Sequence, residues 1–159
     1  MIYNNWKEIN IKSKIKQGRA ICLDYGLKRT GVAISDSGWE IATPLKVVET
    51  SILLQKLQTI INEYKVGLIV IGIPISLNGG FDGIQHNIVN DFTNILQETI
   101  NIDILQHDER LSTVAADRFL SESNMNWRKK KDNIDKIAAS FILQGLLDTI
   151  NYNIDNNIY

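Results

Sequence analysis

Three isolated acidic residues are the strongest chemical signal in this sequence. Asp24 ends one apolar stretch, Glu109 ends another, and Asp135 lies in the apolar stripe of a predicted helix near the C-terminus. An ionised carboxylate beside an apolar core is costly unless a cation meets it, and carboxylate oxygens are ligands that Mg²⁺ accepts. We therefore predict that Asp24, Glu109 and Asp135 form a shared divalent-metal site, and that its chemistry is phosphodiester hydrolysis.

Each of the three acids also has an ordinary structural explanation. Asp is common in turns, and Gly26 just beyond Asp24 favours a sharp turn. Glu109 fits the charged end of a strand. Asp135 follows Asn133, a residue type that caps helices, and the helix dipole favours an acid in the first helical turn.

The neighbouring acid Asp108 competes with Glu109 for the predicted site. Side chains along a strand alternate between the two faces of a sheet, so at most one of this pair shares a face with Asp24. Glu109 is the favoured residue and Asp108 the weaker candidate. The sequence also leaves open whether Asp36 assists the three acids.

Basic residues gather in clusters although the formal net charge is only -1. A protein of this charge does not bind nucleic acid by bulk electrostatics, so a polyanion must be bound locally. One cluster follows the first apolar stretch and another precedes the last predicted helix, and solvated surface charge is the alternative for both. The predicted substrate-binding residues are Lys28, Arg29, Arg110, Arg128, Lys129, Lys130 and Lys131, with Ser112 and Thr113 offering donors at a helix N-terminus.

The first half of the chain predicts three strands, a helix and a fourth strand. The strands are expected over residues 20–23, 30–35 and 41–48, and Pro44 favours an edge strand or a bulge in the third. Leu53–Tyr64 has the spacing of an amphipathic helix. Residues 66–73 are apolar and rich in β-branched side chains, which is typical of a strand at the centre of a sheet.

The second half completes the order βββαβαβαα. It predicts a helical stripe over 88–100, a fifth strand over 102–106, a short helix capped by Ser112 and a last helix from about 134 to 150. Hairpins join antiparallel strands and crossovers join parallel ones. We therefore predict an α/β fold with a ribonuclease H-like, mixed five-stranded sheet flanked by helices.

The expected organisation is one nuclease domain over residues 19–150. An N-terminal extension over 1–18, with a helix as one option, precedes it, and a flexible Asn-rich tail over 151–159 follows. The single cysteine, Cys22, has no disulfide partner, is expected to be buried and fits a reducing compartment. His86 and His107 lack metal-ligand spacing and are expected to be non-ligands. With no apolar stretch near the ~20 residues of a bilayer span, we expect a cytoplasmic protein without a membrane partner.

Several short motifs, taken in order, resemble one known family. They are Leu23–Asp36, Ala42–Leu45, Ile71–Pro74 with the glycine loop after it, Asp108–Thr113, and Asp135–Ala139 leading to Ile142–Gln144. The ordered set resembles the YqgF-type pre-16S rRNA nucleases, which are also described as Holliday junction resolvases. The resemblance covers the chain from Arg19 to about Asp148.

The resemblance implies a ribonuclease H-like hydrolase that acts on nucleic acid in the maturation of small-subunit ribosomal RNA. It implies that Asp24, Glu109 and Asp135 bind Mg²⁺ or Mn²⁺. The implied partner is precursor rRNA, with branched DNA as the alternative and ribosomal particles as a further partner, and no oligomeric state follows. The chain departs from the family pattern at Tyr25 and Leu27, which surround Gly26 where smaller residues are common, so substrate preference stays open.

Two other functions compete with a nuclease. An ATPase of the actin, Hsp70 and sugar-kinase type also has an Asp-x-Gly turn with a following basic residue, but it needs two lobes and this chain has room for one. A non-catalytic RNA-binding module for ribosome assembly would keep the fold without turnover. Tight ATP binding would favour the first, and RNA processing that survives Asp24→Asn would favour the second.

Overall fold

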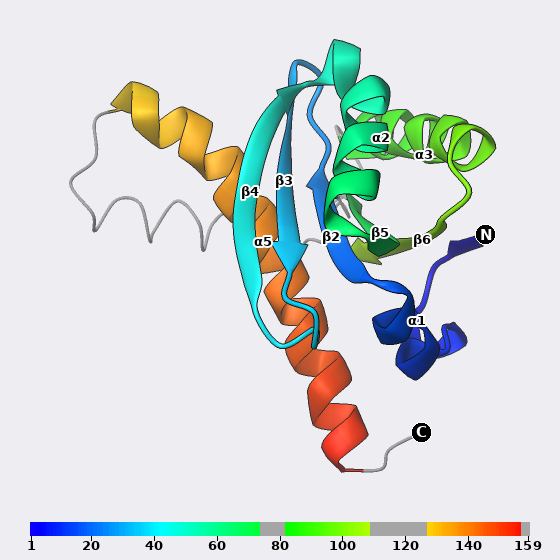
Figure 1. Cartoon of the computed structure of the whole chain (residues 1–159). Coiled ribbons are helices and arrows are strands. Elements are labelled where there is room, and N and C mark those ends of the chain that lie inside the picture. Colours follow the sequence, from blue (N-terminus) through cyan, green and yellow to red (C-terminus); the bar gives the residue numbers. More distant parts are fainter. Residues whose placement is uncertain (74–81, 109–126, 157–159) are drawn as a thin grey trace.

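The computed structural model is built on a six-stranded mixed sheet, with the strand order β1-β6-β5-β2-β3-β4 (Figure 1). It describes residues 1–73, 82–108 and 127–156, and the side chains of 82, 127–133, 135 and 136 lie outside this description. β3 is antiparallel to β2 and β4, whereas β1, β6, β5 and β2 run parallel. This confirms the predicted mixed α/β, ribonuclease H-like architecture. The strands are β1 (Ile2–Tyr3), β2 (Arg19–Asp24), β3 (Arg29–Ser35), β4 (Ala42–Glu49), β5 (Val66–Ile73) and β6 (Asp103–Asp108).

The predicted number of five strands is wrong by one. β1 adds a sixth strand at the edge, where Ile2 and Tyr3 pair in parallel with Ile104 and Leu105 of β6. Two residues are too few to show a strand period, so the sequence pattern could not reveal it. The extension also contains a helix, α1 (Ile11–Gln17), in line with the helical option.

Helices cover both faces of the sheet (Figure 1). α2 (Leu53–Tyr64) and α3 (Asp82–Thr99) lie on one face, and the long α5 (Trp127–Asp155) crosses the other. Alternate residues of β2 enter two separate cores: Leu23 packs on the α2 and α3 side, and Cys22 packs on the α5 side. Two short 3-10 helices, η1 (Trp6–Glu8) and η2 (Thr50–Ile52), complete the elements of the described residues.

The N-terminal extension packs against the end of the sheet through Gly18 and Trp39. The fully buried indole of Trp39 donates from Nε1 to the carbonyl oxygen of Gly18 at 2.9 Å. Gly18 has a φ of 154°, and a Cβ there would stand 1.9 Å from the carbonyl oxygen of Lys65. Only glycine fits this close approach of backbones, so Gly18 sets the position at which α1 meets β5.

The last helix is much longer than predicted. α5 begins at Trp127 rather than near 134, so the basic run at 128–131 lies within its first turns and not before it. Lys and Arg favour helix, but a run of them shows no apolar period that would mark the start. At the other end the helix continues to Asp155, so residues 151–155, expected in a flexible tail, are helical, and Asn151 Nδ2 donates to the carbonyl oxygen of Trp39 at 3.0 Å.

Several smaller predictions can also be compared with the structure. β4 is an edge strand with a register irregularity opposite Val32 and Ala33, as Pro44 indicated. Cys22 is buried and is not part of a disulfide, as expected. Phe141, predicted on the buried side of the last helix, is 37% exposed. The short helix predicted at Ser112 lies outside the described residues. None of the helices described is long and apolar enough to cross a membrane.

Candidate nuclease site at the carboxyl end of the central strands

Asp24 is the last residue of β2, the strand between β5 and β3 in the middle of the sheet. The alternation along β2 puts Asp24 on the same face as Cys22, which packs into the core under α5. The Asp24 residue is half-buried. The predicted first acid therefore lies where a buried strand ends, on the face that α5 covers.

Glycines occupy the neighbouring positions on both sides of Asp24. Gly31 of β3 is its registered partner. On the other side Leu23 pairs with Ile71 of β5, so the next residues along these two parallel strands are Asp24 and Gly72. Because neither glycine has a side chain, the Asp24 carboxylate has no side-chain neighbour at the paired position of either adjacent strand.

His107 extends this row by one further strand. Gly72 pairs with His107 of β6, and the buried neighbour Leu105 packs on the α5 side, so the ring of His107 shares the face of Asp24. Burial lowers the pKa of His107 below its usual value, while the charge of Asp108 acts in the opposite direction. No local sequence pattern marks His107 as a neighbour of Asp24, because only the register of three strands aligns the two residues.

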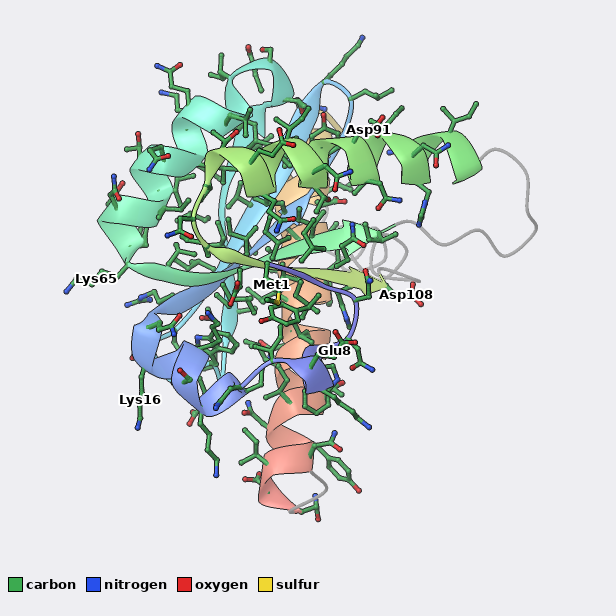
Figure 2. The ribbon with its side chains drawn as sticks, turned by 90° about the vertical axis from the view of Figure 1, so that its right-hand side faces the viewer. Met1, Glu8, Lys16, Lys65, Asp91 and Asp108 are labelled. Atoms are coloured by element: carbon green, nitrogen blue, oxygen red, sulfur yellow. The ribbon has the colours of Figure 1, made fainter. Side chains whose placement is uncertain are left out.

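The structure places Asp108 on the opposite face from Asp24. Gln106, two residues earlier in β6, donates from Nε2 to Oδ1 of Asn90 in α3 at 2.9 Å, which identifies the α3 side. The same amide group of Asn90 contacts Nδ1 of His86 at 3.1 Å. Figure 2 shows Asp108 at the carboxyl end of β6, with Lys65 at the other end of the sheet. The sheet thus separates Asp108 from Asp24. This agrees with the ranking of Asp108 as the weaker candidate for the metal site.

A tight turn follows Asp24 and carries the basic residues Lys28 and Arg29. A Cβ on Gly26 would lie 2.3 Å from the carbonyl oxygen of Arg29, so the two ends of the turn touch and position 26 requires glycine. Leu27 and Lys28 lie at the tip, and both are exposed. The turn therefore presents the cation of Lys28 four residues beyond the candidate catalytic acid.

Thr50 of η2 fixes this turn from the next connection. Its hydroxyl donates to the carbonyl oxygen of Gly26 at 2.6 Å, and its backbone amide donates to the carbonyl oxygen of Lys28 at 3.0 Å. The hydroxyl of Thr30 lies 3.0 Å from that of Thr50 and must be the donor, because the Thr50 hydroxyl already donates its proton to Gly26. Three hydrogen bonds thus hold the turn in one conformation.

Tyr25 anchors the turn on the opposite face. Its ring stacks on Phe92 of α3, with 4.3 Å between ring centroids and 25° between planes. Burial raises the pKa of the Tyr25 phenol above its usual value. The two residues that flank Gly26 therefore have opposite surroundings. Tyr25 packs inward against α3, and Leu27 points to solvent.

The backbone position of Asp135 lies in α5, the helix that covers the face of Asp24. Ala139, one turn later, is fully buried in the same core as Cys22 and Ala33. The helix starts at Trp127, so Asn133 is not its cap and Asp135 is not in its first turn. The helix-cap explanation for this acid is therefore wrong, and its predicted metal role stays a prediction.

Asp36 has a structural role at the other end of the sheet. Its carboxylate accepts the backbone amides of Gly38, Glu40 and Ile41 at 2.7 to 3.1 Å. Burial acts to raise the pKa of Asp36, but these amides more than offset it and hold the pKa below its usual value. Because β3 is antiparallel to β2, Asp36 is a strand length away from Asp24 and does not assist it.

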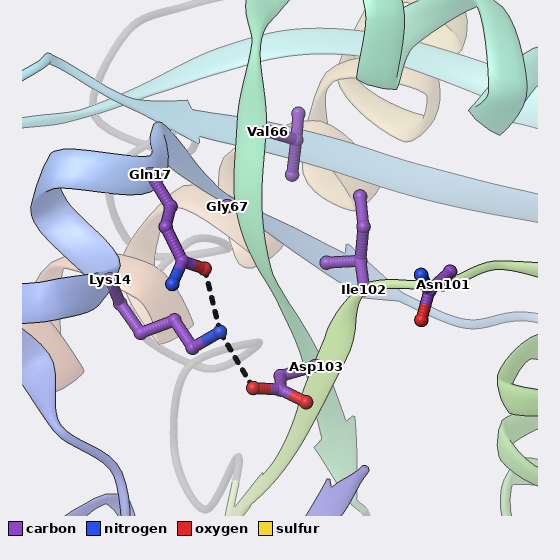
Figure 3. A pocket seen from close by; sticks show the side chains of 7 residues that line it. All are labelled: Lys14, Gln17, Val66, Gly67, Asn101, Ile102 and Asp103. Carbon is purple, nitrogen blue, oxygen red and sulfur yellow. Dashed lines mark hydrogen bonds and ion pairs between the residues drawn. The ribbon is translucent and has the colours of Figure 1, made fainter.

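A pocket of about 310 Å³ lies at this same distant end, between α1 and the starts of β5 and β6 (Figure 3). Its charged groups are paired: Lys14 Nζ lies 2.6 Å from Oδ2 of Asp103 and donates to Oε1 of Gln17 at 2.8 Å. The pocket therefore contributes no group to the row containing Asp24.

The other predicted site residues are only partly covered. Glu109, Arg110, Ser112 and Thr113 lie outside the described residues, and the side chains of 128–131 and 135 are not described. Arg29 is half-buried at the start of β3. Within the segments that the structure describes, no group of three or more His, Cys, Asp or Glu residues is arranged to hold a metal ion. Asp24 is the one predicted metal ligand whose side chain can be placed.

Comparisons with known proteins match this arrangement to one family. A family model described as RuvX, Holliday junction resolvase, matches residues 18–149. A relative from Clostridium tetani, named "Putative pre-16S rRNA nuclease", is 42% identical over 83% of this chain and 97% of its own length. One of the same name from Rickettsia rickettsii is 37% identical over 94% of this chain and 98% of its own.

Among solved structures, the T. thermophilus RuvC in complex with Holliday junction substrate aligns with a TM-score of 0.46 and 8% identity. The alignment covers 78% of this chain and 93% of that chain. The family match and the two relatives cover nearly the whole chain, including Asp24 and the helix that carries position 135. The chain therefore belongs to the RuvX family.

Proposed function

We propose that this protein is a divalent-metal-dependent nuclease that hydrolyses phosphodiester bonds in the processing of pre-16S rRNA. The observation that carries the proposal is the position of Asp24, at the end of β2 between Gly31 and Gly72, on the face covered by α5. The choice of pre-16S rRNA as the substrate is supported by the relatives, which carry the name "Putative pre-16S rRNA nuclease".

The donor set fits a hard divalent cation. Asp24 supplies carboxylate oxygens beside two positions without side chains, and Asp135 belongs to the helix over the same face. Glu109 follows Asp108 in the sequence and is the third predicted ligand, because strand alternation allows only one of this pair to share a face with Asp24. These three residues would hold Mg²⁺ or Mn²⁺, ions that accept a few carboxylates and complete their shell with water and substrate phosphate. When bound, such ions activate water and stabilise the charge of an in-line displacement at phosphorus.

The remaining residues position the substrate. Lys28 at the tip of the Thr50-braced turn contacts a phosphate near the scissile bond, and Arg29 and Arg110 are the further candidates. The basic run 128–131, now placed on the first turns of α5, tracks the more distant backbone. The partner is thus precursor rRNA, free or within a ribosomal particle.

The test is cleavage by purified protein of precursor rRNA and of a four-way DNA junction, with Mg²⁺, Mn²⁺ or EDTA. We expect metal-dependent cleavage of the RNA and a loss of about 100-fold or more in Asp24→Asn. Glu109→Gln and Asp135→Asn should behave alike, with RNA binding retained. Asp36→Asn is the matched control, because it changes an acid of the same type at the other end of the sheet.

Three outcomes would decide against the proposal. Equal cleavage by wild type and Asp24→Asn would identify a contaminant as the nuclease. Cleavage of the junction in preference to the RNA would favour the resolvase activity that the family description names. RNA binding without cleavage under any metal condition would favour a non-catalytic assembly module.

A further inference from the structure

Leu27 is an apolar side chain displayed in solvent at the tip of the turn that follows Asp24. It is 68% exposed, more than any other exposed large apolar residue among those described. The turn beneath it is closed by the contact between Gly26 and Arg29 and is held by Thr50 at 2.6 and 3.0 Å. The exposure of Leu27 is therefore built into a rigid turn.

A single exposed leucine is common on protein surfaces and needs no explanation by itself. Leu27 differs from an ordinary exposed leucine because of its position beside the candidate nuclease site. Lys28 and Arg29 follow it directly, and it lies three positions after Asp24, a span of at most about 10 Å. A nucleic acid whose scissile phosphate lies at Asp24, and whose neighbouring phosphates lie at Lys28 and Arg29, must pass beside this side chain.

The chemistry of leucine selects the part of the nucleic acid that it can contact. A phosphate gains nothing from an aliphatic side chain, whereas the face of a nucleobase is apolar and accepts one. In a continuous duplex the base faces are covered by stacking on their neighbours. Leu27 can therefore reach a base face only where the stack is open, as at a bulge, a frayed end or a branch.

We propose that Leu27 is a specificity-determining residue that packs on an unstacked base of the RNA close to the scissile phosphate. With about 3.4 Å of rise per nucleotide along a strand, a reach of 10 Å places that base within about three nucleotides of the cleavage position. The site thereby selects unpaired or interrupted RNA over a continuous duplex. This inference rests on the proposed nuclease function and adds the structural class of its substrate.

The experiment compares two RNAs of the same sequence around the cleavage position, one fully paired and one with two unpaired nucleotides there. For wild type we expect kcat/KM to favour the interrupted RNA by about 10-fold, in the range of one base contact. Leu27→Ser should reduce this preference to near unity by lowering kcat/KM on the interrupted RNA alone. Leu27→Met should retain this preference. Lys28→Ala should lower kcat/KM on both RNAs equally, because it removes a phosphate contact.

A binding measurement separates failure of this inference from failure of the nuclease assignment. In an Asp24→Asn background, 2-aminopurine at the unpaired position should change its fluorescence on binding, and the added Leu27→Ser change should abolish the response. Because Leu27 is exposed, its variants should keep the wild-type urea midpoint. If Leu27→Ser retains the response and the 10-fold preference, the inference is overturned, whether or not the protein cleaves. If neither the wild type nor any variant binds RNA, both the nuclease assignment and the inference about Leu27 fail.

Discussion

Acidic residues stand at both ends of the central strands, but their surroundings differ. At one end Asp36 accepts three backbone amides of its own loop, and Asp103 pairs with Lys14 at 2.6 Å. At the other end Asp24 lies between Gly31 and Gly72, on the face that α5 covers. The first two carboxylates hold loops and a helix together, whereas the third stands at a strand end between two residues without side chains.

The two ends also differ in how tightly backbone fills them. Gly18 and Gly67 face each other across a contact in which a Cβ on Gly67 would stand 2.9 Å from the Gly18 nitrogen. Glycine there permits close packing of two backbones, and we call this the closed end of the sheet. The glycines beside Asp24 instead flank the candidate catalytic acid at the other end.

The largest effect should come from Gly18→Ala at the closed end. An added Cβ would collide with the carbonyl of Lys65 in a backbone conformation that L-residues rarely adopt, so we expect a loss of about 3 kcal/mol in the free energy of unfolding. Urea denaturation measures it. Cleavage per folded molecule should be unchanged, and a fall in kcat with normal stability would show that the two ends are coupled.

Gly72→Ala should produce the opposite pattern at the Asp24 end. A methyl group between Asp24 and His107 would crowd the candidate catalytic carboxylate, so we expect about a 10-fold lower kcat in the cleavage assay, similar to misplacing a catalytic group slightly. Stability should be checked by the same urea titration. Cleavage at the wild-type rate by a folded Gly72→Ala protein would show that catalysis does not depend on the absence of a side chain at position 72.

Asp103→Asn should weaken the closed end in a pH-dependent manner. Burial acts to raise the pKa of Asp103, but the ammonium of Lys14 is among the groups that hold it below its usual value. A lowered folded pKa means that the charged form stabilises the fold above the unfolded pKa, and that this is lost as pH falls through the folded value. We expect a cost of about 1 kcal/mol at pH 7, which disappears once the pH has fallen below the folded pKa of Asp103. A difference that persists at low pH would contradict the ion pair.

The smallest effect should come from Gly145→Ala in α5. A Cβ there would meet nothing within 4 Å, so the change removes only the helix penalty of glycine. We expect a gain of about 0.5 to 1 kcal/mol, measured by thermal unfolding, with unchanged cleavage. A loss of cleavage would indicate that α5 must flex over the face of Asp24.

Continuous apolar runs made the centre of the fold predictable. Residues 66–73 were predicted with the bounds that β5 has, and Leu53–Tyr64 with those of α2, because each carries a full period of its own element. β1 and the first turns of α5 were missed, since two residues and a basic run show no period. Packing against β6 in one case, and helix propensity in the other, decided those elements.

The candidate site was predictable only as separate residues. The chemical cost of an acid at the end of an apolar strand marked Asp24, and strand alternation separated Asp108 from it. The row formed by Gly31, Gly72 and His107 depends on the register of four strands, which no local pattern encodes. Glu109 lies outside the described residues, so its place in the site is still a prediction.

The long α5 has a consequence for the synthesis of the chain. Its Gln144 accepts the amide of Ala42 at 2.8 Å and its Asn151 donates to the Trp39 carbonyl, across 102 and 112 residues of sequence. β2, β3 and β4 leave the ribosome long before the helix that covers their second face. That apolar face stays uncovered by α5 until translation is nearly complete, and contacts of such long range form slowly. A protein of this design would complete its second core only with the last turns of its final helix.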